Sequence, residues 1–398
     1  MIKLASKDCC TGCGACAYAC PKQCICMKED KLGIIYPVID DTECIDCKCC
    51  QSVCPILKPV TYNQPQKAFA AWSSEEEERR TSASGGVAAE VYKEALKQGY
   101  YIAGAVSNDD FSVSFELSRD VALIAALKNS KYVFSSAYTL FSELKELLAK
   151  NEKVVIIGLP CHIAAIRKLF KDNSNLLLMD VVCHGTTPHS YLAQHIYMLE
   201  KESRQKAQCM SFRDPNTNTY TYTFTLYNTK GERFYSQRTK DGDTYQYGYH
   251  RMISYRENCY HCAFARKERI SDVTLSDYKG IGKLAPCSFN NLKVSSVLVN
   301  TEKGKRFIEN LIQNGSLIAE ERPVMESILG DARLQSPNPK SMLRNIFEKQ
   351  IVATGGDFES AMVKVMRIGL RNKKLMKIYS LPKRIIKKLF KIISCKEI

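Results

Sequence analysis

The sequence has no long apolar run. No stretch approaches the roughly 18 uninterrupted apolar residues of a transmembrane helix, so we expect none. The first residues, MIKLASKDCC, lack the apolar core of a secretory signal peptide. Both absences favour a cytoplasmic protein in a reducing compartment. There the nineteen cysteines are expected to be metal ligands rather than a disulfide framework.

Acidic residues are scarce near the C-terminal end. Residues 361–398 hold twelve Lys or Arg and one acid, Glu397, so they supply +11 of the net charge of +15. The rest of the chain is close to neutral and carries no nucleic-acid-binding motif, so we expect no nucleic-acid partner.

This charge belongs to a predicted helical tail, 331–398. After Pro382, apolar residues such as Ile385 and Leu389 recur at near-helical spacing with Lys and Arg between them. The pattern predicts a basic amphipathic helix. It either contacts an anionic membrane surface or an acidic partner, or packs on its own domain with the charged face in water.

Two copies of one cysteine spacing occupy the first sixty residues. Each copy reads C-x2-C-x2-C-x3-C-P, the run with which bacterial ferredoxins hold [4Fe–4S] clusters. In two-cluster ferredoxins the fourth cysteine of a run binds the other cluster. We therefore predict a ferredoxin-type domain over 1–60, with a short hairpin between its halves. The first cluster is assigned to Cys10, Cys13, Cys16 and Cys54, and the second to Cys44, Cys47, Cys50 and Cys20.

Other uses of these cysteines fit less well. Zinc sites favour two C-x2-4-C pairs separated by a long spacer, and disulfide frameworks occur mainly in short secreted chains. Four cysteines fall outside the repeated spacing, and we expect them to pack beside the clusters as small residues. They are Cys9, Cys24, Cys26 and Cys49.

The longer remainder predicts an α/β layer. Short apolar segments at 153–158 and 175–182 read as buried strands, and each leads into a loop with a cysteine, Cys161 or Cys183. A further C-x2-C pair, Cys259 and Cys262, follows. These four are either buried structural cysteines or ligands of a third cluster. Earlier, SASGGV (82–87) precedes a helical pattern, and such a junction either binds a phosphate or is an ordinary helix cap.

From about residue 65 to 305 the chain resembles the coenzyme F-420 hydrogenase/dehydrogenase beta-subunit family. The matching segments occur in family order. They are SASGGV (82–87), NSKYVFSSA (129–137), GLPCHIAAIRK (158–168), VCHGTTP (182–188), SFRD (211–214), RENCYHCAFARKERISDVTLSD (256–277) and SSVLVNT-x-x-G ending at Gly304. The resemblance implies FAD and a [4Fe–4S] centre in this body. We therefore predict an α+β multidomain protein with beta-subunit regions at 66–150 and 151–330.

The resemblance also implies site residues. The candidates for the flavin or its phosphates are Ser84, Gly85, Gly86, Ser130, Lys131 and Tyr132, whose alternative roles are a helix-cap serine, a surface lysine and a core tyrosine. The implied ligands of the body cluster are Cys161, Cys183, Cys259 and Cys262. No catalytic residue is predicted, since His184 could equally donate a proton or orient its loop.

Some positions depart from the family pattern. His162 replaces a common Gln, and Thr186-Thr187-Pro188 replaces V-P-S. Pro215 follows SFRD where lysine is common, and Ser276-Asp277-Tyr278-Lys279-Gly280 corresponds to the family's G-D-x-W-G without its tryptophan. We expect these loops to line the substrate end, which leaves open whether the substrate is the deazaflavin coenzyme.

The predicted function is an oxygen-sensitive iron–sulfur flavoprotein oxidoreductase. Electrons would pass between a hydride donor or acceptor, FAD, the body cluster, the two N-terminal clusters and an external redox partner. Two alternatives remain: a relay subunit of a larger complex with no substrate site of its own, or a redox-inactive module tethered to a membrane-associated pathway.

Overall fold

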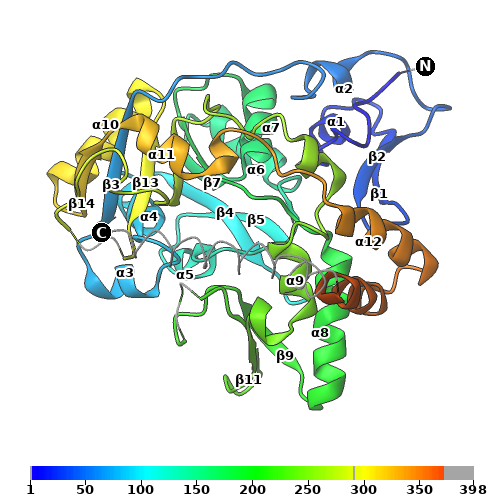
Figure 1. The fold of residues 1–398 in the computed structure, drawn as a ribbon. Helices are drawn as coiled ribbons and strands as arrows, with labels where there is room; N and C mark the ends of the chain where they lie inside the picture. Colours follow the sequence, from blue (N-terminus) through cyan, green and yellow to red (C-terminus); the bar gives the residue numbers. More distant parts are fainter. Residues whose placement is uncertain (1, 218, 220, 290–291, 372–398) are drawn as a thin grey trace, which may run out of the picture.

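The computed structural model describes residues 2–217, 219, 221–289 and 292–371. A nine-stranded sheet runs through the middle of the molecule (Figure 1). Its strands are β3 (Lys67–Ser73), β4 (Tyr101–Ser107), β5 (Val113–Ser118), β6 (Ser135–Ser136), β7 (Val154–Gly158), β8 (Leu176–Val181), β12 (Val273–Asp277), β13 (Ser295–Val299) and β14 (Leu317–Arg322). They lie in the order β14-β3-β13-β12-β8-β7-β4-β5-β6. The sheet is mixed, because β12-β8-β7-β4 and β5-β6 pair in parallel and the other neighbours are antiparallel.

Helices cover both faces of the central strands. In β7, Val155 and Ile157 pack in one apolar core with α4 (Val87–Lys97) and α10 (Glu302–Gln313). Val154 and Ile156 point the other way, into a core with α6 (Leu140–Ala149) and α7 (Pro160–Phe170). Alternate residues of a strand face opposite sides of the sheet, so a continuous apolar run is required where both sides are buried. The predicted α/β layer is therefore present, within the α+β class.

A smaller layer lies below this sheet in Figure 1. Its three strands follow the order β11-β10-β9 and share an apolar core with α8, α12 and the helical residues 358–371. The bounds are β9 (Ala207–Ser211), β10 (Phe224–Asn228), β11 (Arg233–Gln237), α8 (His189–Ser203), α9 (Thr244–His250) and α12 (Met342–Ala353). The remaining short helices are α3 (Glu76–Thr81), α5 (Leu123–Leu127), α11 (Val324–Gly330), η1 (Thr239–Asp241), η2 (Glu257–His261) and η3 (Ala332–Leu334).

The N-terminal segment consists of two similar halves around a hairpin. Each half contributes one short helix, α1 (Ala15–Tyr18) or α2 (Cys49–Ser52). Strands β1 (Ile25–Glu29) and β2 (Ile35–Ile39) pair antiparallel between them, as the sequence predicts. Both helices follow a residue with positive φ, Gly14 or Lys48, which turns the chain sharply between cysteines of one run.

The large sheet crosses the predicted boundary at residue 150. Strand β3 of the predicted 66–150 region pairs with β13 and β14, and β4 pairs with β7, all three partners lying in the predicted 151–330 region. Residue 150 therefore does not separate two sheets. The predicted basic helix after Pro382 lies outside the described residues. None of the helices in the described part of the chain combines the length and apolar character that crossing a membrane requires.

A buried ion cluster joins the lower layer to the last described helix. His195 of α8 is 1% exposed, and its Nε2 lies 3.0 Å from Asp243 Oδ2 while its Nδ1 lies 2.7 Å from Glu359 Oε1. Tyr235 of β11 donates a hydrogen bond to the same Asp243 oxygen, at 2.8 Å. Burial lowers the pKa of His195, but the two carboxylates outweigh it and raise that pKa to about 9.

This cluster predicts a pH-dependent stability. Because the folded pKa of His195 is raised from 6.5 to about 9, its stabilising contribution is complete below pH 6.5 and is lost as pH rises through about 9. We expect the loss to be roughly 2 to 3 kcal/mol in the free energy of unfolding. Urea unfolding from about pH 6 to pH 10 measures it. The His195→Gln protein should lack this part of the profile, and an identical pH profile in both proteins would contradict the assignment.

Candidate functional site

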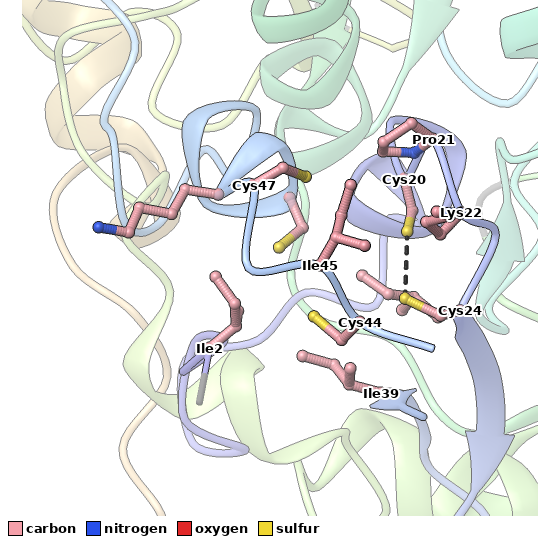
Figure 2. Close-up of a pocket in the computed structure, with 12 residues that line it drawn as sticks. Ile2, Cys20, Pro21, Lys22, Cys24, Ile39, Cys44, Ile45 and Cys47 are labelled. Atoms are coloured by element: carbon pink, nitrogen blue, oxygen red, sulfur yellow. Dashed lines mark hydrogen bonds between the residues drawn. The ribbon is translucent and has the colours of Figure 1, made fainter. Parts of the chain in front are cut away.

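The eight N-terminal cysteines gather around two separate cavities. The first is lined by Cys10, Cys13, Cys16 and Cys54. The second is lined by Cys20, Cys44, Cys47 and Cys50, together with Cys24 (Figure 2). In both cavities the fourth cysteine of one run joins three cysteines of the other, which is the grouping that the spacing predicts. Four sulfur donors that converge on one space fit a [4Fe–4S] cluster.

The cysteines outside the repeated spacing behave differently from one another. Cys24 is buried, and its Sγ lies 3.4 Å from that of Cys20, so the second cavity has five thiols (Figure 2). Cys9 and Cys49 are half-buried, but Cys26 is exposed on β1. The expectation that all four pack beside the clusters as small residues is wrong for Cys26, which is exposed and lines neither cavity, because alternate residues of the hairpin face solvent.

A third cavity lies at the carboxyl ends of β7 and β8. Cys161 is in the first turn of α7, directly after β7, and Cys183 follows β8 by two residues. Cys259 and Cys262 reach the same cavity from η2. The structure thus brings together the four body cysteines that the resemblance implies. Burial raises the pKa of Cys262 to about 11 and that of the other three thiols as well, so a cation is needed to hold them as thiolates.

A buried ion pair holds the arm 256–269, the segment that contains the C-x2-C pair, against the large sheet. Arg269 donates from its guanidinium to Asp180 Oδ2 at 2.6 Å, and both side chains are at most 2% exposed. The same guanidinium donates to the carbonyls of Phe264 and Arg266, at 3.1 Å each. Since Asp180 is in β8, this pair fixes the segment after Cys262 against the strand that precedes Cys183.

A fourth, much larger cavity of about 560 Å³ adjoins the third. The two share wall residues on the loops after β7 and β8, including His162, Cys183 and His184. Five of the six predicted flavin residues line the large cavity, namely Ser84, Gly86, Ser130, Lys131 and Tyr132. Its volume lies within the usual range for small-molecule and cofactor sites.

Gly85 does not line this cavity. Its N–H donates to Ser295 Oγ at 2.9 Å, and an added Cβ would lie 2.4 Å from the Ala71 carbonyl oxygen. Gly85 is therefore needed for close packing of α4's leading loop on β3 and β13. Gly86, with a φ of +86°, directly precedes α4, whose first residues Val87 and Ala88 face the cavity. A helix N-terminus at this wall suits a phosphate.

Cationic and aromatic side chains define the other walls. Arg213 donates to Tyr132 Oη at 3.2 Å and to Asp277 Oδ2 at 3.3 Å, and it lies over the Tyr222 ring. The Tyr132 ring stacks on Tyr249, with centroids 4.6 Å apart. Such a flat aromatic wall beside a guanidinium suits a planar, electron-rich ring. The sequence did not single out Arg213, Tyr222 or Tyr249, although Arg213 lies within the SFRD segment.

Lys131 is the cation with the fewest competing partners. Its Nζ donates to two carbonyls, those of Ala126 at 2.6 Å and Lys128 at 3.1 Å, and no carboxylate partner is found within the described residues. Burial lowers the pKa of Lys131 to about 8. Lys128, by contrast, forms an ion pair with Glu78 at 2.5 Å. Lys131 is thus the cavity cation best placed to meet an added anion.

The family departures fall on different sides of this cavity. His162 lines it, and burial lowers the pKa of His162 to about 4, so the imidazole is neutral. Its Nε2 lies 3.1 Å from the Ser135 carbonyl, while its buried Nδ1 has no partner in the described chain. Thr186, Ser276 and Lys279 also line the cavity, but Pro188 and Pro215 are not among its lining residues. Only some of the departing positions can therefore contact a substrate.

Comparison with known proteins agrees with this arrangement of motifs. Residues 151–324 match the family model that describes the C terminus of the coenzyme F420 hydrogenase/dehydrogenase beta subunit. Over this segment the chain is similar to that family. The matched segment begins just before β7, whose carboxyl end borders the third cavity, and it contains all four body cysteines.

Two relatives and one solved structure illustrate the range of similarity. The chain is 21% identical over 335 residues to the F component of F(420)H(2) dehydrogenase, a subunit from Methanosarcina mazei, covering 81% of this chain and 87% of that protein. It is 26% identical over 200 residues to an uncharacterized protein of Methanocaldococcus jannaschii, covering 42% and 54% of the two chains. A chain of the F420-reducing [NiFe] hydrogenase complex from Methanosarcina barkeri is 16% identical, with 79% and 94% covered and a TM-score of 0.43.

The ion pair that supports the family's body cysteines can be tested directly. Removing one partner of a buried ion pair leaves an uncompensated charge, so Asp180→Asn should lower the free energy of unfolding by about 3 to 5 kcal/mol. Asp172→Asn is the matched control, since Asp172 pairs with Arg167 at 2.6 Å but is 92% exposed. It should cost about 0 to 1 kcal/mol. Equal losses in the two variants, measured by chemical denaturation, would rule out the assigned role of the Asp180 pair.

Proposed function

We propose that this chain is an iron–sulfur flavoprotein oxidoreductase that moves electrons between a hydride donor or acceptor and [4Fe–4S] clusters through FAD. The observation that carries the proposal is the arrangement of four cavities. Three are lined by at least four cysteines each, and the third shares lining residues with both the first and the large cavity. The match of residues 151–324 to the C terminus of the coenzyme F420 hydrogenase/dehydrogenase beta subunit supports an electron-transfer role.

The cysteines would hold three clusters. The first is assigned to Cys10, Cys13, Cys16 and Cys54, the second to Cys20, Cys44, Cys47 and Cys50, and the third to Cys161, Cys183, Cys259 and Cys262. Thr11 lines both the first and the third cavity, so these two sites are direct neighbours. An electron entering at the body site would thus reach the N-terminal sites without crossing solvent.

The large cavity would hold FAD, which when bound exchanges two electrons with a hydride donor and single electrons with clusters. The chain's own groups would position it. The N-terminus of α4, behind Gly86, and Lys131 would bind phosphate oxygens. Arg213, held by Asp277 and Tyr132, would orient the planar rings against the tyrosine wall. The shared wall around His162 and Cys183 would face the body cluster.

The substrate is proposed to be a deazaflavin coenzyme or another small hydride donor or acceptor that reaches the large cavity. The Methanosarcina mazei relative is named as part of an F(420)H(2) dehydrogenase, which supports the deazaflavin. Its name also describes a subunit, so we propose a protein redox partner for this chain. If the purified protein binds no flavin, or no hydride donor reduces its clusters, the relay-subunit alternative is correct instead.

Metal and flavin content tests the cofactor assignment. After anaerobic reconstitution we expect about twelve iron atoms per chain, four for each of three clusters, and about one FAD. Cys161→Ser should retain about eight iron atoms, because only the body site loses a ligand. Cys209→Ser is the control, since Cys209 is exposed on β9 and should leave the iron content unchanged. About eight iron atoms in the unsubstituted protein, with no flavin, would contradict the proposed cluster and flavin of the body.

Flavin affinity tests the proposed phosphate contact. Losing a charge-assisted contact should weaken FAD binding about tenfold in the Lys131→Gln protein, while Lys131→Arg should bind far more tightly than Lys131→Gln. Because burial lowers the pKa of Lys131 to about 8, affinity should also fall as pH rises through that value. Fluorescence titration of the protein with FAD measures both effects. Lys145→Gln removes an exposed charge from α6 and should bind FAD normally; equal weakening there would argue against a specific contact.

A further inference from the structure

Arg256 differs from every other buried arginine in the described part of the chain. Five arginines are buried, and four of them lie within ion-pair distance of a carboxylate: Arg213, Arg269, Arg322 and Arg344. Arg256 is 2% exposed, and within the described residues it has no such partner. Its Nε also has no hydrogen-bond acceptor. A guanidinium stays protonated, so this is a buried positive charge without a counter-ion among the residues that the structure describes.

The contacts of Arg256 span two parts of the molecule. Its guanidinium donates to the carbonyls of Thr11 at 2.8 Å and Ile35 at 3.1 Å, both in the N-terminal segment. Its own N–H donates to the Thr186 carbonyl at 2.9 Å, in the loop after Cys183. Arg256 itself lies three residues before Cys259. It therefore connects the loops that carry cysteines of the first and third cavities.

The surroundings leave little room for anything but this guanidinium. Its Cζ lies 4.0 Å from the centre of the Phe134 ring. On the other side, a Cβ at Gly12 would lie 2.4 Å from Arg256 Nη2. Gly12 lies between Cys10 and Cys13, so the chain of the first cavity approaches Arg256 closely because a glycine is present. This packing holds the charge at a fixed place between the two cavities.

The charge lies beside both cavities. Arg256 lines the third cavity, and the Thr11 carbonyl to which it donates belongs to a residue that lines both the first and the third. A bound [4Fe–4S] cluster is a net anion, because its four thiolates outweigh the positive charge of its core, and reduction adds one more negative charge. Two such anions would supply the counter-charge that the described residues do not give Arg256.

We propose that Arg256 is the shared counter-ion of the first-cavity and third-cavity clusters, a positioning residue that makes both easier to reduce and sets the gap between them. The inference rests on the proposed function, since it requires clusters at both sites. It adds a specific consequence: the potentials of these two clusters depend on one side chain, which lines the third cavity and donates to Thr11 of the first. The second-cavity cluster is independent of Arg256, because neither Arg256 nor the residues to which its guanidinium donates line that cavity.

Redox titration of the anaerobically reconstituted full chain, followed by electron paramagnetic resonance, tests the proposal. In the Arg256→Gln protein with full iron content, we expect two of the three clusters to become harder to reduce. The expected change is about tenfold in the reduction equilibrium, equivalent to 59 mV for one electron. Arg256→Lys keeps the charge and should stay closer to the unsubstituted protein. Arg266→Gln, which removes an exposed charge paired with Glu268 from the same arm, should shift none of them.

Each outcome decides the matter. Unchanged potentials in Arg256→Gln with full iron overturn the proposal, as do equal shifts in Arg256→Lys and Arg256→Gln, because they would show a purely steric role. If Arg256→Gln cannot retain iron, Arg256→Lys decides alone: full iron with near-normal potentials supports the counter-ion, and equal iron loss overturns it. Fewer than three clusters in the unsubstituted protein would instead contradict the proposed function itself.

Discussion

The parallel pairing of β7 with β8 is the constraint on which both body cavities depend. Register pairs Gly158 with Asp180, so the two strands end side by side and their following loops leave from one edge of the sheet. Cys161 and Cys183 come together for this reason alone. Asp180 then holds Arg269, and through it the arm that contains Cys262. The same loops form the wall that separates the third cavity from the large one.

Buried arginines do most of the positioning around that edge, and each has a different partner. Arg269 is neutralised by a carboxylate of the sheet and orders a loop. Arg213 is neutralised by Asp277 and contributes to the wall of the large cavity. Among the buried arginines that the structure describes, Arg256 is the one whose guanidinium meets only carbonyls and a ring. Guanidinium groups suit these places because they stay charged and donate in several directions at once.

The N-terminal cysteines show how far spacing alone can reach. The first three cysteines of each run lie within seven residues, so the local spacing keeps their sulfur atoms together. The fourth sulfur of each group comes from the other run, as the two-cluster ferredoxin pattern predicts. The same spacing said nothing of Cys24, whose approach to Cys20 depends on the turn into β1. It also gave no reason to expect an exposed Cys26. Similarly, the glycine-rich segment before a helix indicated a phosphate site without showing which glycine reaches it. Gly85 packs against β3 and β13, whereas Gly86 lines the large cavity.

The sequence by itself determined the cysteine groups, the apolar strands and the family of the body, since all three depend on short-range patterns. Tertiary structure decided which distant loops meet. One cavity is lined by Arg213, Tyr222 and Tyr249, and Arg256 donates to the Thr11 carbonyl. These residues are far apart in the sequence, so no local periodicity predicts their contacts. Residues far apart in the chain become neighbours only through sheet order and packing. The paired cysteine runs therefore predict the metal chemistry, and the folded body places its own four cysteines beside the large cavity.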